Sequence, residues 1–201
     1  HDGQFDDARL AVNLAQTCIE NGATLLNHFK VQSLKKSSKG LVNGLVAIDQ
    51  ETQKVYNLKA KVVVNATGVF TDEVLKMDQA QALNTIRPSQ GIHLVFDREF
   101  LPGNDAIMIP KTDDGRVLFL VPWHNKVVMG TTDTLIDSHS LEPKPLEEEI
   151  NFILQTANRY LNKKVQRSDV RSIFAGLRPL AAPKDGNEKT KEISRSHKII
   201  V

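Results

Sequence analysis

Residues 62–68 read Val-Val-Val-Asn-Ala-Thr-Gly, an apolar run that passes directly into small residues. Consecutive β-branched residues are typical of a strand buried on both faces of a sheet. Ala66 and Gly68 carry little or no side chain, so the turn that follows can approach a pyrophosphate or ribityl chain closely. Many buried strands end in such turns for packing reasons alone. The stretch therefore fits either a packing turn or a strand and turn that face a dinucleotide.

The residues before this run predict a helix and a small antiparallel sheet. Asp6 and Asp7 suit a helix N-terminus, Asn21-Gly22 suits its end, and an apolar stripe that includes Cys18 runs between them. Residues 24–34 are expected to be extended, and residues 41–48 and 54–58 alternate around a turn at 49–53. This order of helix, strand, meander and strand suits an α/β nucleotide-binding layer with an inserted β-ribbon.

The residues after Gly68 predict a helix at 69–77 and then a second, mainly antiparallel sheet. Its four strands are expected at 92–96, 106–109, 117–121 and 126–129, because turn-forming residues separate them. Pro145 suits the first turn of a helix that covers this sheet with one apolar face, formed by Ile150, Ile153, Leu154, Ala157 and Leu161. Residues 172–180 should be extended and return toward the first layer, and a solvated loop at 183–191 precedes a short final hairpin.

Composition indicates an ordinary soluble globular protein. The 201 residues are 40% hydrophobic and 25% charged, and the formal net charge of +2 gives no field that would favour nucleic acid. A lone cysteine, Cys18, excludes a disulfide framework and favours a reduced, cytoplasmic compartment, and we expect it to pack in the core. No apolar run reaches the roughly 18 residues of a membrane span, and no His, Cys or carboxylate cluster has metal-ligand spacing.

Several sequence blocks accompany the 62–68 stretch. They are Gln-Phe-Asp-Asp-Ala-Arg at 4–9, Arg-Pro-Ser-Gln-Gly-Ile-His at 87–93, Gly-Thr-Thr-Asp at 130–133, Phe-Ala-Gly-Leu-Arg-Pro at 174–179 and Ser-Arg at 194–195. In this order and spacing, the chain resembles the middle of FAD-dependent glycerol-3-phosphate dehydrogenases and oxidases. The most specific parts are the blocks at 4–9 and 176–179.

The resemblance implies a mixed α/β (α+β) fold and FAD as cofactor. Residues 1–77 would form part of a Rossmann-like FAD-binding layer with its β-ribbon, residues 78–170 the substrate domain, and residues 171–201 a return segment toward the FAD domain. Val31, Ala66, Thr67 and Gly68 would contact FAD, although a valine in a strand is usually a core residue. None of the 11 glycines forms Gly-x-Gly-x-x-Gly, the motif that holds the pyrophosphate in such folds. We therefore expect an internal fragment that lacks its main cofactor motif.

Arg178 is the strongest candidate site residue because it lies between Leu177 and Pro179 in an apolar segment. A buried guanidinium needs an anionic partner. A structural ion pair with a carboxylate would satisfy it, and so would a bound phosphate, which suits a bidentate guanidinium. The resemblance implies that Arg178 faces the substrate and has a catalytic as well as a binding role.

His93 and Arg195 complete the candidate site. His93 follows Gln90-Gly91 on a strand, where a histidine is usually structural, but imidazole titrates near neutral pH and can accept a hydroxyl proton. The resemblance implies that His93 is the base or orients the hydroxyl group, and that Arg195 gives the phosphate a second cation. Arg195 could equally be an exposed strand arginine. The Gly-Thr-Thr-Asp block at 130–133 fits a hairpin turn, and the resemblance implies that it lies beside the substrate domain. We assign it no catalytic role.

The function implied by the resemblance is oxidation of sn-glycerol 3-phosphate to dihydroxyacetone phosphate by hydride transfer to FAD. One alternative is an amino-acid oxidase-like flavoenzyme, in which an arginine holds a carboxylate. Another is a phosphate-ligand-binding module without turnover in isolation. The electron acceptor would be a quinone or oxygen, and a quinone would place the parent enzyme peripherally on the inner face of the cytoplasmic membrane.

Overall fold

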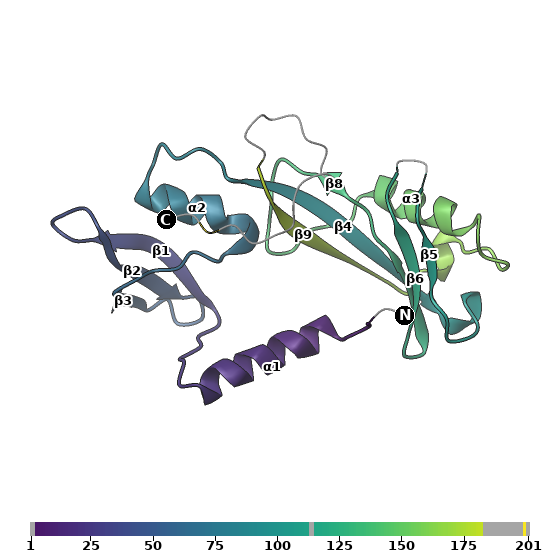
Figure 1. Cartoon of the computed structure of the whole chain (residues 1–201), viewed down its shortest axis with the longest axis horizontal. Coiled ribbons are helices and arrows are strands. Elements are labelled where there is room, and N and C mark those ends of the chain that lie inside the picture. Colours follow the sequence, from purple (N-terminus) through teal and green to yellow (C-terminus); the bar gives the residue numbers. More distant parts are fainter. Residues whose placement is uncertain (1–2, 113–114, 183–198, 200–201) are drawn as a thin grey trace. The chain divides into compact units, whose positions relative to one another are not determined.

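A computed structural model describes residues 3–112, 115–182 and 199 of the chain (Figure 1). The chain forms two compact units, residues 1–64 and residues 65–201. The described helices and strands are mixed α and β with antiparallel sheets, which confirms the predicted fold class. No helix in the described ranges combines the length and the apolar character that crossing a membrane requires.

The first unit begins with helix α1, Asp7–Glu20. Its start and end are as predicted: the Asp6 side chain accepts a hydrogen bond from the Arg9 amide at 2.9 Å, and Gly22 follows the helix with φ +84°. Its predicted apolar stripe exists, but α1 has no buried residue. Cys18 is exposed, so the prediction that it packs in the core is wrong. The reason is that none of the described residues of this unit covers that face of the helix.

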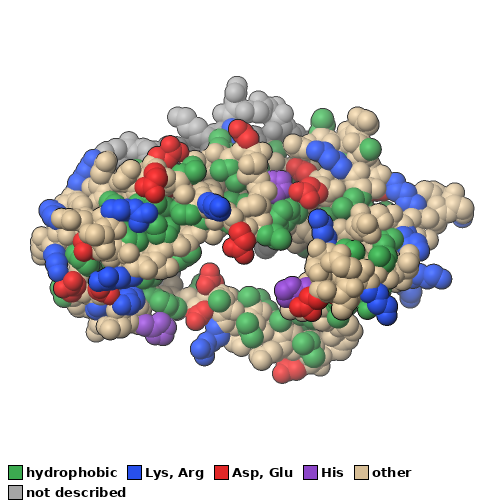
Figure 2. Space-filling view, turned by 180° about the vertical axis from the view of Figure 1, so that it is seen from behind, with side chains coloured by type: hydrophobic (Ala, Val, Ile, Leu, Met, Phe, Trp, Pro, Cys, Tyr) green, Lys and Arg blue, Asp and Glu red, His purple; other side chains and the backbone are tan. Residues whose placement is uncertain are grey.

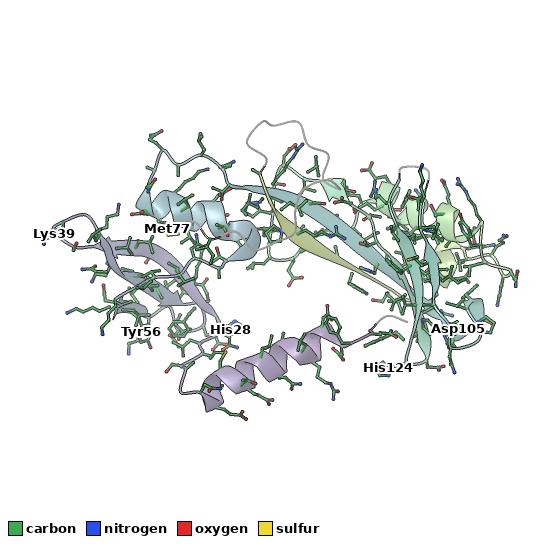
Figure 3. The ribbon with its side chains drawn as sticks, in the orientation of Figure 1. His28, Lys39, Tyr56, Met77, Asp105 and His124 are labelled. Carbon is green, nitrogen blue, oxygen red and sulfur yellow. The ribbon has the colours of Figure 1, made fainter. Side chains whose placement is uncertain are left out.

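The β-ribbon is an antiparallel sheet in the order β1-β2-β3, formed by Phe29–Lys36, Val42–Asp49 and Val55–Lys59. The turn after β2 is held by Asp49, whose carboxylate accepts hydrogen bonds from the Thr52 hydroxyl at 2.6 Å and the Glu51 amide at 2.9 Å. Tyr56 of β3 packs its ring 5.3 Å from that of Phe29 in β1 (Figure 3). The meander is therefore confirmed, with the first strand shorter than the extended stretch expected at 24–34.

The strand predicted at residues 62–64 does not form. These residues belong to no sheet, and the side chains of Val62 and Val64 are 74% and 81% exposed. A strand is stable only when its backbone groups pair with a neighbour. None of the described strands pairs with residues 62–64, so the β-branched run is unpaired here and the strand prediction is wrong.

The second unit opens with a short 3₁₀ turn η1, Gly68–Phe70, and helix α2, Thr71–Asp78, close to the predicted helix at 69–77. Asp72 ties α2 to the following sheet: its carboxylate accepts hydrogen bonds from the Thr85 hydroxyl, the Thr85 amide and the Ile86 amide, at 2.7, 2.9 and 3.1 Å. Burial favours a higher pKa for Asp72, but these hydrogen bonds to the charged form outweigh it and lower the pKa below its ordinary value.

The main sheet of the second unit has the order β5-β6-β7-β4-β8, and β9 also pairs with β4. Its strands, all paired antiparallel, are β4 (Ile86–Asp97), β5 (Ile107–Ile109), β6 (Leu118–Trp123), β7 (Lys126–Gly130), β8 (Thr134–Leu135) and β9 (Ser172–Ala181). The four predicted strands are confirmed. Residues 172–180 are extended as predicted, and β9 pairs with β4 through ten residue pairs, from Ile86 and Ala181 to Val95 and Ser172. The domain limits at 77 and 170 stay a prediction.

Helix α3, Glu147–Ala157, packs on this sheet and completes the core (Figure 1). The predicted apolar face is buried: Ile150, Ile153, Leu154, Ala157 and Leu161. It packs with the buried residues of β4, β6 and β7. Pro145 was expected in the first turn but precedes the helix, which begins at Glu147 after the N-cap residue Leu146. Two 3₁₀ turns, η2 (Arg98–Phe100) and η3 (Arg167–Asp169), lie in the connections.

Candidate functional site

The candidate site lies on the face of the main sheet that β4 turns away from α3. Ile92, Leu94 and Phe96 alternate along β4 and are fully buried in the core. Because successive side chains of a strand point to opposite faces, Gly91, His93 and Val95 belong to the other face. His93 and Val95 are half-buried there.

His93 is held between its two neighbouring strands. It lies opposite Gly130 of β7 and Phe174 of β9. The imidazole stacks nearly parallel on the Phe174 ring, with centroids 5.0 Å apart and an angle of 11° between the planes. A Cβ atom at Gly130 would lie 2.3 Å from the imidazole Cδ2, so the absence of a side chain at Gly130 makes room for the ring. The ring therefore has one defined orientation on the open face of the sheet.

The side chain of Arg178 extends from β9 to residues 131–133, which follow β7. Its Nη1 donates to the Thr132 carbonyl oxygen at 3.1 Å, and its Nη2 donates to the Thr131 hydroxyl at 3.0 Å. Nη1 also lies 3.8 Å from a carboxylate oxygen of Asp133. The structural ion pair considered for this arginine thus has a partner, at long range. Of the Arg178 side chain, 25% is exposed.

Gly91 places Arg178 and His93 on the same face. A Cβ atom at Gly91 would lie 2.4 and 2.6 Å from the guanidinium nitrogens of Arg178. The guanidinium therefore lies directly over Gly91, which precedes His93 by two residues on β4 and shares its face. The structure brings together the two residues to which the sequence assigned catalytic roles.

Residues 131–133, which contact Arg178, are held in place by a buried network of polar side chains. The sequence analysis did not predict this network. The Asp133 carboxylate accepts a hydrogen bond from the Ser89 hydroxyl. The Thr132 hydroxyl accepts from the Ile92 amide at 3.0 Å and donates to the buried Glu149 carboxylate at 2.8 Å. Residues 130–133, to which we assigned no catalytic role, therefore position a candidate site residue. One signal was available: Glu149 lies four residues before Ile153, on the apolar face of its helix.

A carboxylate also fixes the far end of β4. Asp97 pairs with Lys126 of β7 and with Arg171, each at 2.7 Å. Hydrogen bonds from Lys126 and then Arg171 lower the pKa of Asp97 below its ordinary value. Asp72 binds Ile86, the first residue of β4, and Asp97 is the last residue of the strand. The strand that carries Gly91 and His93 is therefore anchored at both ends.

The turn at residues 65–68 carries three of the predicted cofactor contacts. The Asn65 side chain donates to the Thr71 carbonyl oxygen at 2.9 Å and accepts from the Thr67 hydroxyl at 2.8 Å. Gly68 has φ +61°, a conformation that favours glycine, and no atom lies within 4 Å of its Cβ position. Ala66 and Thr67 are exposed. A rigid turn with small, exposed residues fits the close approach of a phosphate or ribityl group.

Val31 and Arg195 are the other two predicted site residues. Val31 is half-buried in β1, opposite Ala47, in the first unit. Arg195 lies outside the described residues. Two cavities of about 470 and 480 Å³ lie in the second unit, and neither His93 nor Arg178 lines them. Within the described ranges no three His, Cys, Asp or Glu side chains are grouped to hold a metal ion, and Figure 2 shows basic and acidic side chains interspersed over the visible surface.

Comparison with known proteins shows the family of this chain. The model of the FAD dependent oxidoreductase family matches residues 1–198. The mitochondrial glycerol-3-phosphate dehydrogenase of Schizosaccharomyces pombe is 44% identical over 189 residues, which are 90% of this chain and 29% of that protein. The glycerol-3-phosphate dehydrogenase structure from Bacillus halodurans, complexed with FAD, is 36% identical with a TM-score of 0.81 over 88% of this chain and 36% of that chain.

A more distant structure shares the fold alone. Glycine oxidase from Bacillus cereus is 17% identical, with a TM-score of 0.60 over 85% of this chain and 43% of that chain. The chain spans only about a third of the length of the S. pombe and B. halodurans relatives, 29% and 36% respectively.

Proposed function

Because the chain belongs to the FAD dependent oxidoreductase family, we propose that it forms the substrate domain and part of the FAD domain of an enzyme that oxidises sn-glycerol 3-phosphate to dihydroxyacetone phosphate. The observation that carries this proposal is the presence of a partly exposed arginine and an oriented imidazole on one face of the sheet. An alcohol that bears a phosphate needs a cation for the anion and an acceptor for the hydroxyl proton. Arg178 and His93 supply these two groups.

Arg178 binds the phosphate group in this proposal. Its Nη1 and Nη2 are already oriented by Thr132 and Thr131, so little side-chain entropy is lost when an anion binds. A guanidinium can donate two parallel hydrogen bonds to phosphate oxygens, each contributing roughly 1.5 to 3 kcal/mol. Arg195 is proposed as a second cation for the same group.

His93 takes the hydroxyl proton of the alcohol or orients the hydroxyl group. Oxidation removes a hydride from C2 and a proton from the oxygen, and imidazole accepts protons near neutral pH. FAD, when bound, supplies the redox chemistry by accepting the hydride. Val31, Ala66, Thr67 and Gly68 would contact FAD, and this part of the proposal is supported by the exposure of Ala66 and Thr67 and by the lack of a side chain at Gly68.

The test is an activity assay on the FAD-loaded enzyme that carries this chain. It should convert glycerol 3-phosphate to dihydroxyacetone phosphate and leave glycerol, which lacks the phosphate, almost unoxidised. Glycine and other amino acids are the decisive control, since turnover of an amino acid with no turnover of glycerol 3-phosphate would support the amino-acid oxidase alternative. Binding of glycerol 3-phosphate without oxidation of any of these compounds would support the phosphate-binding module.

The electron acceptor and the location are proposed together. A quinone acceptor would require peripheral association with the inner face of the cytoplasmic membrane, whereas oxygen would allow an enzyme dispersed in the cytoplasm. Reaction rates with a quinone analogue and with oxygen separate the two. Fractionation of the source cells also tests the location, including the mitochondrial compartment that the name of the S. pombe relative gives.

A further inference from the structure

The buried carboxylate of Glu149 is the most extensively hydrogen-bonded acidic group behind the candidate site. Glu149 is 3% exposed and lies in the first turn of α3. Its Oε1 accepts from the hydroxyl groups of Thr132 and Thr134, at 2.8 and 2.9 Å. Its Oε2 accepts from the Gln90 side-chain amide and the Leu146 backbone amide, at 2.7 and 3.0 Å. Four donors therefore meet one carboxylate, and they come from β4, the segment after β7, β8 and the start of α3.

Burying a carboxylate costs free energy because the charge loses its water, and hydrogen bonds from all four donors are needed to offset that cost. Glu149 has a structural part in this, since its carboxylate accepts the Leu146 amide at the start of α3 and an apolar residue in its place would leave these four donors without that acceptor. What distinguishes the group is the residue it contacts. Thr132 uses its hydroxyl to bind Glu149 and its backbone carbonyl to bind the guanidinium of Arg178.

Thr132 is held firmly between these partners. Its hydroxyl also accepts a hydrogen bond from the Ile92 amide at 3.0 Å, so both hydrogen-bonding functions of the hydroxyl are used inside the protein. Thr132 is itself 1% exposed. The carbonyl oxygen that orients Arg178 thus belongs to a residue whose side chain is fixed by Glu149 on one side and β4 on the other.

We propose that Glu149 is a positioning residue that acts through Thr132 on Arg178 and thereby sets the affinity of the site for the phosphate group of the substrate. The inference rests on the proposed function. Glu149 touches neither the anion nor the reacting atoms, so it should affect binding of the anion and leave the chemical step nearly unchanged.

Two matched threonines make the test specific. Thr132→Val and Thr134→Val each remove one hydroxyl donor from the same Oε1 atom without changing the branched shape of the side chain. Thr132→Val also removes the acceptor of the Ile92 amide, and the melting temperature reports that additional loss. Only Thr132 also contacts Arg178. Glu149→Gln is the direct variant: its amide puts two donors into a place where the carboxylate accepts four hydrogen bonds, so at least one contact must be lost. Thr132→Ser keeps the hydroxyl and serves as the conservative rescue.

The measurements use the FAD-loaded enzyme that carries this chain. They are KM and kcat for glycerol 3-phosphate, the inhibition constant of inorganic phosphate and the melting temperature. Glu149→Gln and Thr132→Val should raise KM and the phosphate inhibition constant together, by about tenfold, which equals about 1.4 kcal/mol. Their kcat should stay within about threefold of the parent. Thr134→Val should change neither constant by more than about twofold, and Thr132→Ser should return both to near the parent values.

Each possible failure has a distinct meaning. If the parent enzyme does not oxidise glycerol 3-phosphate, the proposed function is wrong. If the parent is active but Thr132→Val and Thr134→Val shift both constants equally, or only lower the melting temperature, Glu149 is structural and the inference is refuted. Should Glu149→Gln fail to fold, the comparison of the two threonine variants still decides the question.

Discussion

Replacing Gly91 with alanine would place one methyl group against the Arg178 guanidinium. The new Cβ would lie 2.4 Å from Nη2, 2.6 Å from Nη1 and 2.6 Å from the Thr131 hydroxyl oxygen. Carbon and nitrogen atoms in contact normally stay about 3.5 Å apart. The guanidinium must therefore move by about 1 Å, which is feasible because it is the end of a long, partly exposed side chain.

A displacement of this size breaks the contacts that orient Arg178. Its hydrogen bonds to the Thr132 carbonyl oxygen and the Thr131 hydroxyl are 3.1 and 3.0 Å long. An extension of about 1 Å takes both beyond hydrogen-bonding range. If the misplaced guanidinium loses one charge-assisted bond to the substrate phosphate, roughly 1.5 to 3 kcal/mol of binding is lost, and KM should rise about 10- to 150-fold.

The assay is steady-state oxidation of glycerol 3-phosphate by Gly91→Ala, Arg178→Ala and the double variant. The effect of the methyl group should largely disappear in the Arg178→Ala background, because the group that it displaces is gone. Gly176→Ala is the stability control: Gly176 is paired with Gly91, but no atom lies within 4 Å of its Cβ position. Gly91→Ala and Gly176→Ala should each have a melting temperature within a few degrees of the parent.

Two results would refute this reasoning. A Gly91→Ala enzyme with unchanged KM would mean that the orientation of Arg178 does not matter for substrate binding. An equal rise in KM in the presence and absence of Arg178 would mean that the methyl group acts on another part of the site.

Three further predictions concern the mechanism, the fold and the cofactor. Arg178→Ala should chiefly raise KM, whereas His93→Ala should lower kcat by about 10² to 10⁴. The kcat of His93→Ala should partly recover at high pH, where solvent can take the proton. Near-normal kcat of His93→Ala from neutral to high pH would remove His93 from the mechanism. Because folding lowers the pKa of Asp72, its stabilisation is complete above the unfolded pKa of about 3.9 and is lost as pH falls through the folded pKa. In urea titrations, Asp72→Asn should therefore unfold more easily at pH 7, by about 1 to 3 kcal/mol, and lose less stability than the parent between pH 5 and pH 2; parallel pH curves for the two proteins would contradict this. The purified 201-residue chain should be colourless and unable to reduce a dye with glycerol 3-phosphate, since the glycine motif that holds the pyrophosphate is missing from it; stoichiometric yellow FAD would show that the turn at 65–68 contributes far more to binding.

The elements that sequence patterns predicted well are those whose signals are local. The caps of α1, the meander around Asp49 and the apolar stripe of α3 depend on residues within one or two turns of each other. The strand at 62–64 failed for the opposite reason, since its valines need a partner strand from elsewhere and the described chain offers none. The same limit applies to Cys18, because a stripe shows which face of a helix is apolar and not what covers it.

The candidate site shows a similar division. Arg178 and His93 could be proposed from their residue types and their neighbours in sequence. The contacts of Arg178 with Thr131 and Thr132, and of Thr132 with Glu149, join residues that are 17 to 47 positions apart. Such contacts depend on strand register, which the sequence alone did not give.

The register of β4 has a consequence for insertions and deletions. Along this strand the core residues Ile92 and Leu94 alternate with Gly91 and His93, and β7, β8 and β9 all pair with it. Adding or removing a single residue between Arg87 and Gly91 would move every following side chain of β4 to the opposite face of the sheet. Ile92 and Leu94 would then lie on the site face, and the His93 imidazole would point into the core toward α3. A change of two residues would preserve the faces but shift every partner. Changes of length inside β4 should therefore be rejected, which makes this strand a poor place for a tag or a loop graft.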